Sequence, residues 1–350
     1  MDRPANQNFH HAQTALARPA GPDSLFYFGS RHVDPAMVRL VCGLVLALVF
    51  FSLVLFRPQG SLNFASARWY RSVPVVEAGS ADELMDHLQS HNLWNLPENS
   101  LVSPLLVQRL PSDFPFLDMG TQKQAFLHTL LPVAMVALAE VEEERQTLER
   151  ILAGLRVEPA VFLFDSEDDE NPLKELRRHE VRFLEYLCRK YRTCDVELLR
   201  HRVNPVPVSL IMAQAALESS WGGSRFALEG NNLFGIWTWN GDGMVPAARE
   251  NGKSHRVAAY PSLLDSVRSY ILMLNRGHAY ASFRKIRQES MDSLRLANGL
   301  LRYSERRHAY VAEVAGLIRS NRLQKYDQLL LAGFPSRQES RLAWRSVSLQ

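Results

Sequence analysis

The chain has 350 residues and a formal net charge of +3, and 46% of its residues are hydrophobic and 22% are charged. These fractions are ordinary for a globular protein with one large or two modest domains, so they exclude disorder of the whole chain. The small net charge and the scattered arginines argue against nucleic acid as a partner. The sequence has no dinucleotide-binding, phosphate-loop or HExxH motif, and its three cysteines match no zinc spacing. We therefore expect neither a cofactor nor a metal.

An uncharged apolar segment, LVCGLVLALVFFSLVLF, occupies residues 40–56. It approaches the length of about 20 residues with which a helix crosses a bilayer, so we predict a single transmembrane helix there. The alternatives are a buried core helix and a cleaved signal peptide, the second being favoured if translation began at Met37. The arginines on the two sides of the segment do not fix its orientation. Residues 1–39 lack periodicity and are predicted to be a disordered tail.

Residues 57–195 are predicted to form a helical region next to the membrane. A helix is expected at about 81–90, and a longer helical pattern at 121–155 contains Pro132 and ends in a charged, solvent-exposed face. The acidic run DSEDDE at 165–170 lacks the glycine and the spaced ligands of a calcium loop, so it indicates a solvated linker.

Two cysteines close the next helical segment. Cys188 and Cys194 are near enough to form a disulfide, which requires an oxidising compartment, but two separate thiols fit the sequence equally well. Pro205 then marks the start of a further helical unit. We assign a C-terminal domain to residues 196–330 and a polar tail to residues 331–350.

The first helix of this unit carries a single glutamate among small apolar residues. Ile211, Gln214, Ala215 and Glu218 share one face at helical spacing, so Glu218 ends a stripe that we expect to be buried. Desolvation and the negative end of the helix dipole both act to raise the pKa of this carboxyl group, as a general acid requires. The alternative is an ordinary charge that reaches solvent past the helix end, and the helix pattern taken alone favours it.

The residues after this helix indicate a small antiparallel sheet. The segment NNLFGIWTW at 231–239 is typical of a strand, and NGDG at 240–243 and NGK at 251–253 are typical of turns, which together predict a three-stranded meander. Helical spacing resumes at Pro261. We therefore predict a mainly α fold with a small antiparallel β-hairpin lobe, and a cleft between lobe and helices into which Glu218 points.

The motif AQAALESSWGGSRFALEGNNLFGI at residues 213–236 resembles the signature of the glucosaminidase domain of glycoside hydrolase family 73, which is found in flagellar muramidases and bacterial autolysins. The resemblance covers about residues 200–326, and the spacing of the later motifs is similar to the Bax-like branch of the family. It implies a lysozyme-like α+β fold and cleavage of the β-1,4 bond after N-acetylglucosamine in peptidoglycan. Glu218 stands at the position of the general acid.

The group that works with Glu218 is left open by the sequence. Family members often carry an acidic residue on the hairpin, and Glu250 occupies a comparable place; the alternative is an exposed charge at a strand end. Asp242 is a weaker candidate. A third route uses the N-acetyl group of the substrate and needs no second carboxylate.

The resemblance also suggests residues that contact the sugar. Tyr303 matches a tyrosine that is important in related enzymes and is our further catalytic candidate, although the A-T-D-P stretch expected after it is absent; a core tyrosine is the alternative. Aromatic rings stack on sugars, but they also fill cores. The predicted substrate-binding residues are Asn232, Phe234, Trp237, Trp239 and Tyr310.

These inferences predict a membrane-anchored peptidoglycan hydrolase with its catalytic domain in the periplasm. Peptidoglycan lies outside the inner membrane, so the first 39 residues would be cytoplasmic. Peptidoglycan strands and the membrane are the expected partners. The alternatives are a lytic transglycosylase, which leaves 1,6-anhydro ends, and a cell-wall binding module without catalysis.

Overall fold

The computed structural model describes residues 73–96, 101–155, 163, 176–238, 243–246 and 256–334, and the account that follows concerns these residues. All of them belong to one compact unit, Leu62–Gln350. The predicted cytoplasmic tail, transmembrane helix and acidic linker lie outside the described residues, as does nearly all of the predicted polar tail.

The unit is mainly helical, as predicted, with short strands between the helices. In chain order its strands and α-helices are β1 (Val75–Val76), α2 (Ala81–Ser90), β2 (Leu101–Val102), β3 (Leu106–Val107), α3 (Met119–Gly154), α4 (Arg178–Tyr191), α5 (Val196–Arg202), α6 (Val208–Glu218), α7 (Arg225–Gly230), β4 (Trp237–Thr238), β5 (Arg256–Val257), α8 (Leu263–Arg276), α9 (Ala281–Glu289), α10 (Ser293–Ala297), α11 (His308–Ser320) and β6 (Leu330–Leu331).

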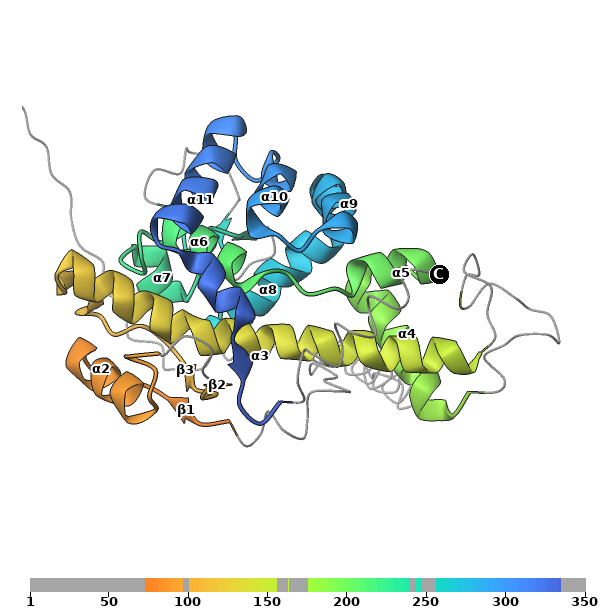
Figure 1. Cartoon of the computed structure of the whole chain (residues 1–350), viewed down its shortest axis with the longest axis horizontal. Helices are drawn as coiled ribbons and strands as arrows, with labels where there is room; N and C mark the ends of the chain where they lie inside the picture. The colour runs from red at the N-terminus through yellow and green to blue at the C-terminus, as the bar shows by residue number, and fades with distance from the viewer. Residues whose placement is uncertain are drawn as a thin grey trace, which may run out of the picture. The chain divides into compact units, whose positions relative to one another are not determined.

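The long helix α3 is the axis of the unit (Figure 1). Asp118 caps its start by accepting hydrogen bonds from the backbone N–H groups of Gly120 and Thr121, and the helix runs through Pro132 without a break. Figure 1 shows α6, α8 and α11 on one side of α3 and α2 with β1 on the other. Among the described residues it is the helix long and apolar enough to span a membrane, but 94% of its most apolar stretch is buried inside the protein. In this structure α3 is therefore a core helix.

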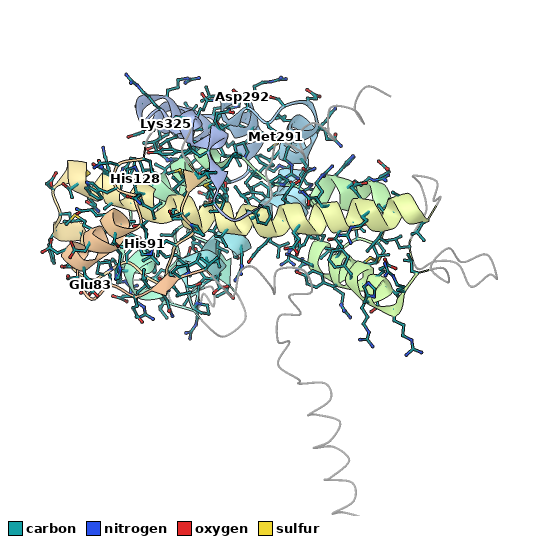
Figure 2. All side chains as sticks on the ribbon, turned by 60° about the horizontal axis from the view of Figure 1, so that its bottom comes forward. Glu83, His91, His128, Met291, Asp292 and Lys325 are labelled. Carbon is teal, nitrogen blue, oxygen red and sulfur yellow. A yellow bond between two sulfur atoms is a disulfide. The ribbon has the colours of Figure 1, made fainter. Side chains whose placement is uncertain are left out.

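Helix α3 also contacts the C-terminal part of the unit. His128 on α3 is buried, and its Nε2 lies 3.3 Å from the hydroxyl of Tyr326. Burial, helped by the nearby charge of Lys325, lowers the pKa of His128 to about 4. Figure 2 shows His128 and Lys325 near one another toward the left end of the unit. The imidazole is thus a neutral packing group at neutral pH.

Short parallel pairings, which the sequence did not predict, reinforce this closure. Val75 in β1 stands opposite Leu106 in β3, and Leu101 in β2 stands opposite Leu330 in β6. The main hydrophobic cluster accordingly joins residues 73–141 with residues 206–331. The core therefore runs across residue 196, where the sequence suggested a domain boundary.

A second, smaller cluster packs the end of α3 against α4 and α5. At the end of α4, Cys188 and Cys194 form a disulfide, so the alternative of two separate thiols is not what the structure shows. The residues between them turn the chain, and Arg192 adopts a left-handed conformation with φ of 55°.

The predicted β lobe follows α7. Strands β4 and β5 pair in the antiparallel sense, with Trp237 opposite Val257, and Met244 forms a bridge to Val257. The rest of the predicted middle strand and most of both turns lie outside the described residues, so the three-stranded meander stays a prediction.

Candidate active site

Helix α6 delivers Glu218 to the surface of the core as its last helical residue. Every residue from Val208 to Ala216 is buried, because α6 packs against α3 on one side and α11 on another. Asp327 caps the start of the helix by accepting from the backbone N–H and the hydroxyl of Ser209, at 2.8 and 2.6 Å.

The chain leaves α6 through an unusually sharp turn. Ser220, Trp221 and Gly222 have φ values of 52°, 58° and 81°. The Ser219 hydroxyl donates to the carbonyl oxygen of Ala215 at 2.6 Å and accepts from the N–H of Gly222 at 2.8 Å. A Cβ on Gly222 would lie 2.6 Å from Leu110, so only glycine fits there. The left-handed residues therefore begin at Ser220, two positions before the first glycine.

The Glu218 carboxyl group is half-buried, and burial raises its pKa above its ordinary value. Three weaker effects modify that shift. A hydrogen bond with the Tyr310 hydroxyl and the charge of Arg306 lower the pKa, and the charge of Glu313 raises it. The predicted direction and its first cause, desolvation, agree with this geometry.

A chain of buried polar groups supports Tyr310. Tyr270 donates to Oε1 of Gln214, and Nε2 of Gln214 donates to the Tyr310 hydroxyl at 2.8 Å. Because the Tyr310 oxygen already accepts from Gln214, its own proton is free to point at the Glu218 carboxylate. Gln214, on the same helix face as Glu218, thus orients the tyrosine that contacts it.

The loop opposite Glu218 is built around one buried asparagine. The Asn232 amide donates to the carbonyl oxygens of Ile236 and Ala258, both at 2.8 Å, and its Oδ1 accepts from the N–H groups of Phe234 and Ile236. Asn232 is 1% exposed and does not line the cleft. Asn232 is a predicted substrate-binding residue; in the structure its polar atoms face the loop backbone, so it positions the loop.

Aromatic rings hold this loop against the helices. Phe234 stacks on Tyr270 with ring centroids 4.1 Å apart, and the Tyr303 hydroxyl donates to the carbonyl oxygen of Phe234 at 2.8 Å. Tyr303 also stacks on Tyr310 at 5.3 Å. Gly235, with φ of 63°, lies next to Oε2 of Glu218. Glycine suits position 235 because of this left-handed backbone conformation, whereas a Cβ there would lie 3.6 Å from Oε2 of Glu218, an ordinary contact.

These groups border a cleft of about 870 Å³. Five predicted site residues line it: Glu218, Phe234, Trp237, Tyr303 and Tyr310. The Trp237 side chain is 47% exposed, which suits a ring that stacks on a ligand. The predicted Trp239, Glu250 and Asp242 lie outside the described residues, so their places in the site are not tested.

Several lining residues escaped prediction. Tyr280 lies beside Tyr303, and burial together with the charge of Glu218 raises its pKa to about 12. Met273 and Arg276 come from α8, and Arg192 comes from the disulfide loop. The only sequence signal was the helical spacing of α8, which identifies buried positions but does not say which flank meets a cleft.

The charges in the cleft have a simple pattern. Among the lining residues that the structure describes, Glu218 is the one carboxylate, and Arg192, Arg276 and Arg306 carry positive charge. No group of three or more metal-ligating side chains that could hold a metal occurs in the described part of the chain. The arrangement can therefore donate a proton from Glu218 and hold a polar or anionic ligand.

Comparison with known proteins places this geometry in context. Residues 197–323 match the family model "Glucosaminidase: Mannosyl-glycoprotein endo-beta-N-acetylglucosaminidase". The chain is similar to Protein bax of Escherichia coli K12, with 29% identity over 184 residues, which are 52% of this chain and 59% of that protein. It is also similar to Peptidoglycan hydrolase FlgJ of Escherichia coli K12, with 37% identity over 90 residues, which are 22% of this chain and 29% of that protein.

One solved structure is also similar in sequence. The catalytic domain of the autolysin Auto from Listeria monocytogenes shares 25% identity, and the match covers 52% of this chain and 96% of that domain with a TM-score of 0.30. The chain spans less than two thirds of the length of the curated relatives that it matches. The resemblance predicted from the sequence is confirmed by the family model and these relatives.

Proposed function

We propose that this chain, whose residues 197–323 form a glucosaminidase domain with Bax-like relatives, hydrolyses the β-1,4 bond after N-acetylglucosamine in peptidoglycan. One observation carries the proposal. The half-buried Glu218, with its pKa raised by burial, faces a cleft of about 870 Å³ that is bordered by aromatic rings. The relatives named as peptidoglycan hydrolases support the choice of substrate.

Glu218 acts in this proposal as the general acid. Its raised pKa keeps a larger fraction of the carboxyl group protonated at a given pH, so a proton is available for the leaving oxygen as the sugar becomes oxocarbenium-like. The carboxylate that remains is half-buried, and the Tyr310 hydroxyl and the charge of Arg306 stabilise it.

Tyr303 has a different part from the one that the resemblance implies. Its hydroxyl donates a hydrogen bond to the carbonyl oxygen of Phe234, and its ring stacks on Tyr310. We therefore assign it as a positioning residue for Tyr310 and for the loop. Glu250, Asp242 and the substrate acetamido group remain the candidates for the partner of Glu218.

We further propose that the enzyme is anchored in the inner membrane by residues 40–56 with its catalytic domain in the periplasm, and that its fold is lysozyme-like. The Cys188–Cys194 disulfide supports an oxidising compartment. The relatives that act on the cell wall support a location in the envelope.

The second candidate function is lytic transglycosylation. It is favoured by one observation, that Glu218 is the single carboxylate among the described residues that line the cleft. Such an enzyme also works with one glutamate, but it closes the sugar on itself and leaves 1,6-anhydro ends.

Digestion of purified peptidoglycan by the full-length protein tests both candidates. Mass spectrometry of the products should show new reducing N-acetylglucosamine ends, and the Glu218→Gln variant should release none. Anhydro ends without reducing N-acetylglucosamine would establish the transglycosylase instead. No release by the parent protein, while it still binds peptidoglycan, would indicate a binding module.

A further inference from the structure

Two arginines line the cleft without any assigned role. Arg192 comes from the turn after α4, and Arg276 is the last residue of α8. Arg192 also lies outside residues 197–323, which match the glucosaminidase family. We propose that Arg192 and Arg276 form a subsite that binds the carboxylates of the peptide stems on a peptidoglycan strand. This inference rests on the proposed function for the identity of its ligand.

Arg276 brings the two arginines together. One of its terminal nitrogens donates to the carbonyl oxygen of Lys190 at 3.0 Å, which joins the end of α8 to the end of α4. A guanidinium group has five N–H donors, so this bond leaves most of the planar fork for a ligand. The arginine thus fixes its own position with one edge and presents the rest to the cleft.

The backbone that carries Arg192 is held from three directions. The Cys188–Cys194 disulfide closes the turn around it, and the Arg192 N–H donates to the carbonyl oxygen of Cys188. Arg202 donates to the carbonyl oxygens of Tyr191 and Arg192, at 2.7 and 2.9 Å. The exposed Arg192 side chain therefore extends from a backbone that is held in place at the edge of the cleft.

The positive charges of Arg192 and Arg276 favour an anionic ligand at this end of the cleft. Burial lowers the pKa of Arg276, and the like charge of Arg192 lowers it further. In the part of the cleft lining that the structure describes, Glu218 is the single carboxylate, and Arg306 next to it already has Glu313 as an ion-pair partner. No ion pair is described for Arg192 or Arg276. A carboxylate between them would relieve the repulsion and accept charge-assisted hydrogen bonds from both.

The chemistry of the substrate identifies that carboxylate. The sugars of an intact strand are uncharged, because the lactyl group of each muramic acid is joined to its stem through an amide. The free carboxylates belong to the stems. A strand that lies in the cleft with one sugar at Glu218 would therefore offer stem carboxylates to a cationic corner away from the bond being cleaved.

Binding measurements in a Glu218→Gln background test this subsite without hydrolysis. The ligands are intact strands, the same strands with stem carboxylates converted to neutral amides, and strands stripped of their stems. The first variant is Arg192→Gln, and its matched control is Arg189→Gln, an exposed arginine in the last turn of α4 that does not line the cleft.

We expect the protein to bind intact strands about three- to tenfold more tightly than amidated strands, as for a partly solvated charge pair. Arg192→Gln should bring this ratio close to one, and Arg189→Gln should leave it as it was. Arg276→Lys, which retains a donor for the Lys190 carbonyl oxygen but loses the planar fork, should lower the ratio in part.

Equal binding of intact and amidated strands by the parent, or the same ratio in Arg192→Gln, would overturn the subsite. If stem-stripped strands bind as tightly as intact strands, the arginines recognise the exposed lactyl carboxylates instead. That result would also overturn the proposed subsite. A protein that binds intact strands more tightly than amidated strands, loses this preference in Arg192→Gln, and yet shows no hydrolysis when Glu218 is intact would refute the proposed function and leave the subsite standing.

Discussion

The molecule places a glutamate among tyrosines at two separate points, and the two are used differently. Glu144, on α3, is 5% exposed and accepts hydrogen bonds from the hydroxyls of Tyr186 and Tyr191, at 2.8 and 2.7 Å, and from Lys190 at 2.6 Å. Glu218, at the end of α6, is half-buried, and among the described residues its hydrogen-bond partner is Tyr310.

The difference lies in how completely each carboxylate is satisfied. Glu144 has three donors, one of them a cation, so its negative charge is well stabilised and its oxygens are occupied. At Glu218 burial outweighs the single hydrogen bond and raises the pKa, and the carboxyl group still faces an open cleft. A saturated carboxylate holds helices together, whereas an incompletely satisfied one is able to exchange a proton with a ligand.

The first test of this contrast is Glu218→Gln. Glutamine has the same shape but no proton to donate, so turnover of peptidoglycan should fall by about 10²- to 10⁴-fold. The far-UV circular dichroism spectrum should stay that of the parent, because Glu218 ends the helix and a glutamine oxygen can still accept the hydrogen bond from Tyr310. A variant with full turnover would remove Glu218 from the chemistry.

Glu144→Gln should show the opposite pattern. The amide oxygen can keep part of the tyrosine contacts, but Lys190 loses its ion-pair partner and the amide N–H₂ group meets hydroxyls that were donating. We expect a loss of about 2 kcal/mol in the free energy of unfolding, since the pair is mostly shielded from water while Lys190 can still reach solvent. Urea unfolding measures the loss, and turnover of the folded fraction should be close to that of the parent.

The contrast also marks what the sequence could predict. The spacing of Ile211, Gln214 and Glu218 predicted a buried helix face, because burial of a face follows from local periodicity. Taken alone it favoured an ordinary charge for Glu218, and the family motif was needed to favour a general acid with a raised pKa. The same reasoning described the second half of α3 as a solvent-exposed face and so missed Glu144. Its partners Tyr186 and Tyr191 come from another helix, and no local pattern reports that contact.

The rest of the site depends on long-range contacts in the same way. The link from Tyr270 through Gln214 to Tyr310 joins three helices, and the Arg192–Arg276 corner joins two. Sequence motifs predicted Phe234, Trp237 and Tyr310 as substrate-binding residues, and all three line the cleft. They could not show that Asn232 turns inward.

Tyr310→Phe sharpens the assignment of the site. Removing the hydroxyl removes a hydrogen bond that lowers the pKa of Glu218, so that pKa should rise and the high-pH limb of the kcat profile should move to higher pH. The carboxylate formed after proton transfer is also less stabilised, and we expect kcat to fall about tenfold.

Tyr303→Phe provides the comparison for this variant. Tyr303→Phe loses the hydrogen bond to the Phe234 carbonyl oxygen but keeps the hydrogen bond between Tyr310 and Glu218. The high-pH limb of its kcat profile should therefore stay at the pH of the parent, even if kcat falls. A limb that moves equally in both variants would assign the shift to loop displacement rather than to the Tyr310 hydroxyl.

The smallest expected effect concerns stability. Burial raises the pKa of Glu218 in the folded protein above its ordinary value of 4.5, so the folded state binds this proton more tightly than the unfolded chain. The stability that comes with the protonated carboxyl group is complete below the unfolded pKa and is lost as pH rises through the folded pKa. Arg306 and Tyr310 reduce this loss and Glu313 increases it.

Glutamine has no charge to bury, so Glu218→Gln should gain stability relative to the parent as pH rises from 4 to 7, by no more than about 1 kcal/mol. Melting temperatures of both proteins across this range measure the difference. A difference that shrinks with rising pH would mean that hydrogen bonds to the anion outweigh its burial, which would make Glu218 resemble Glu144.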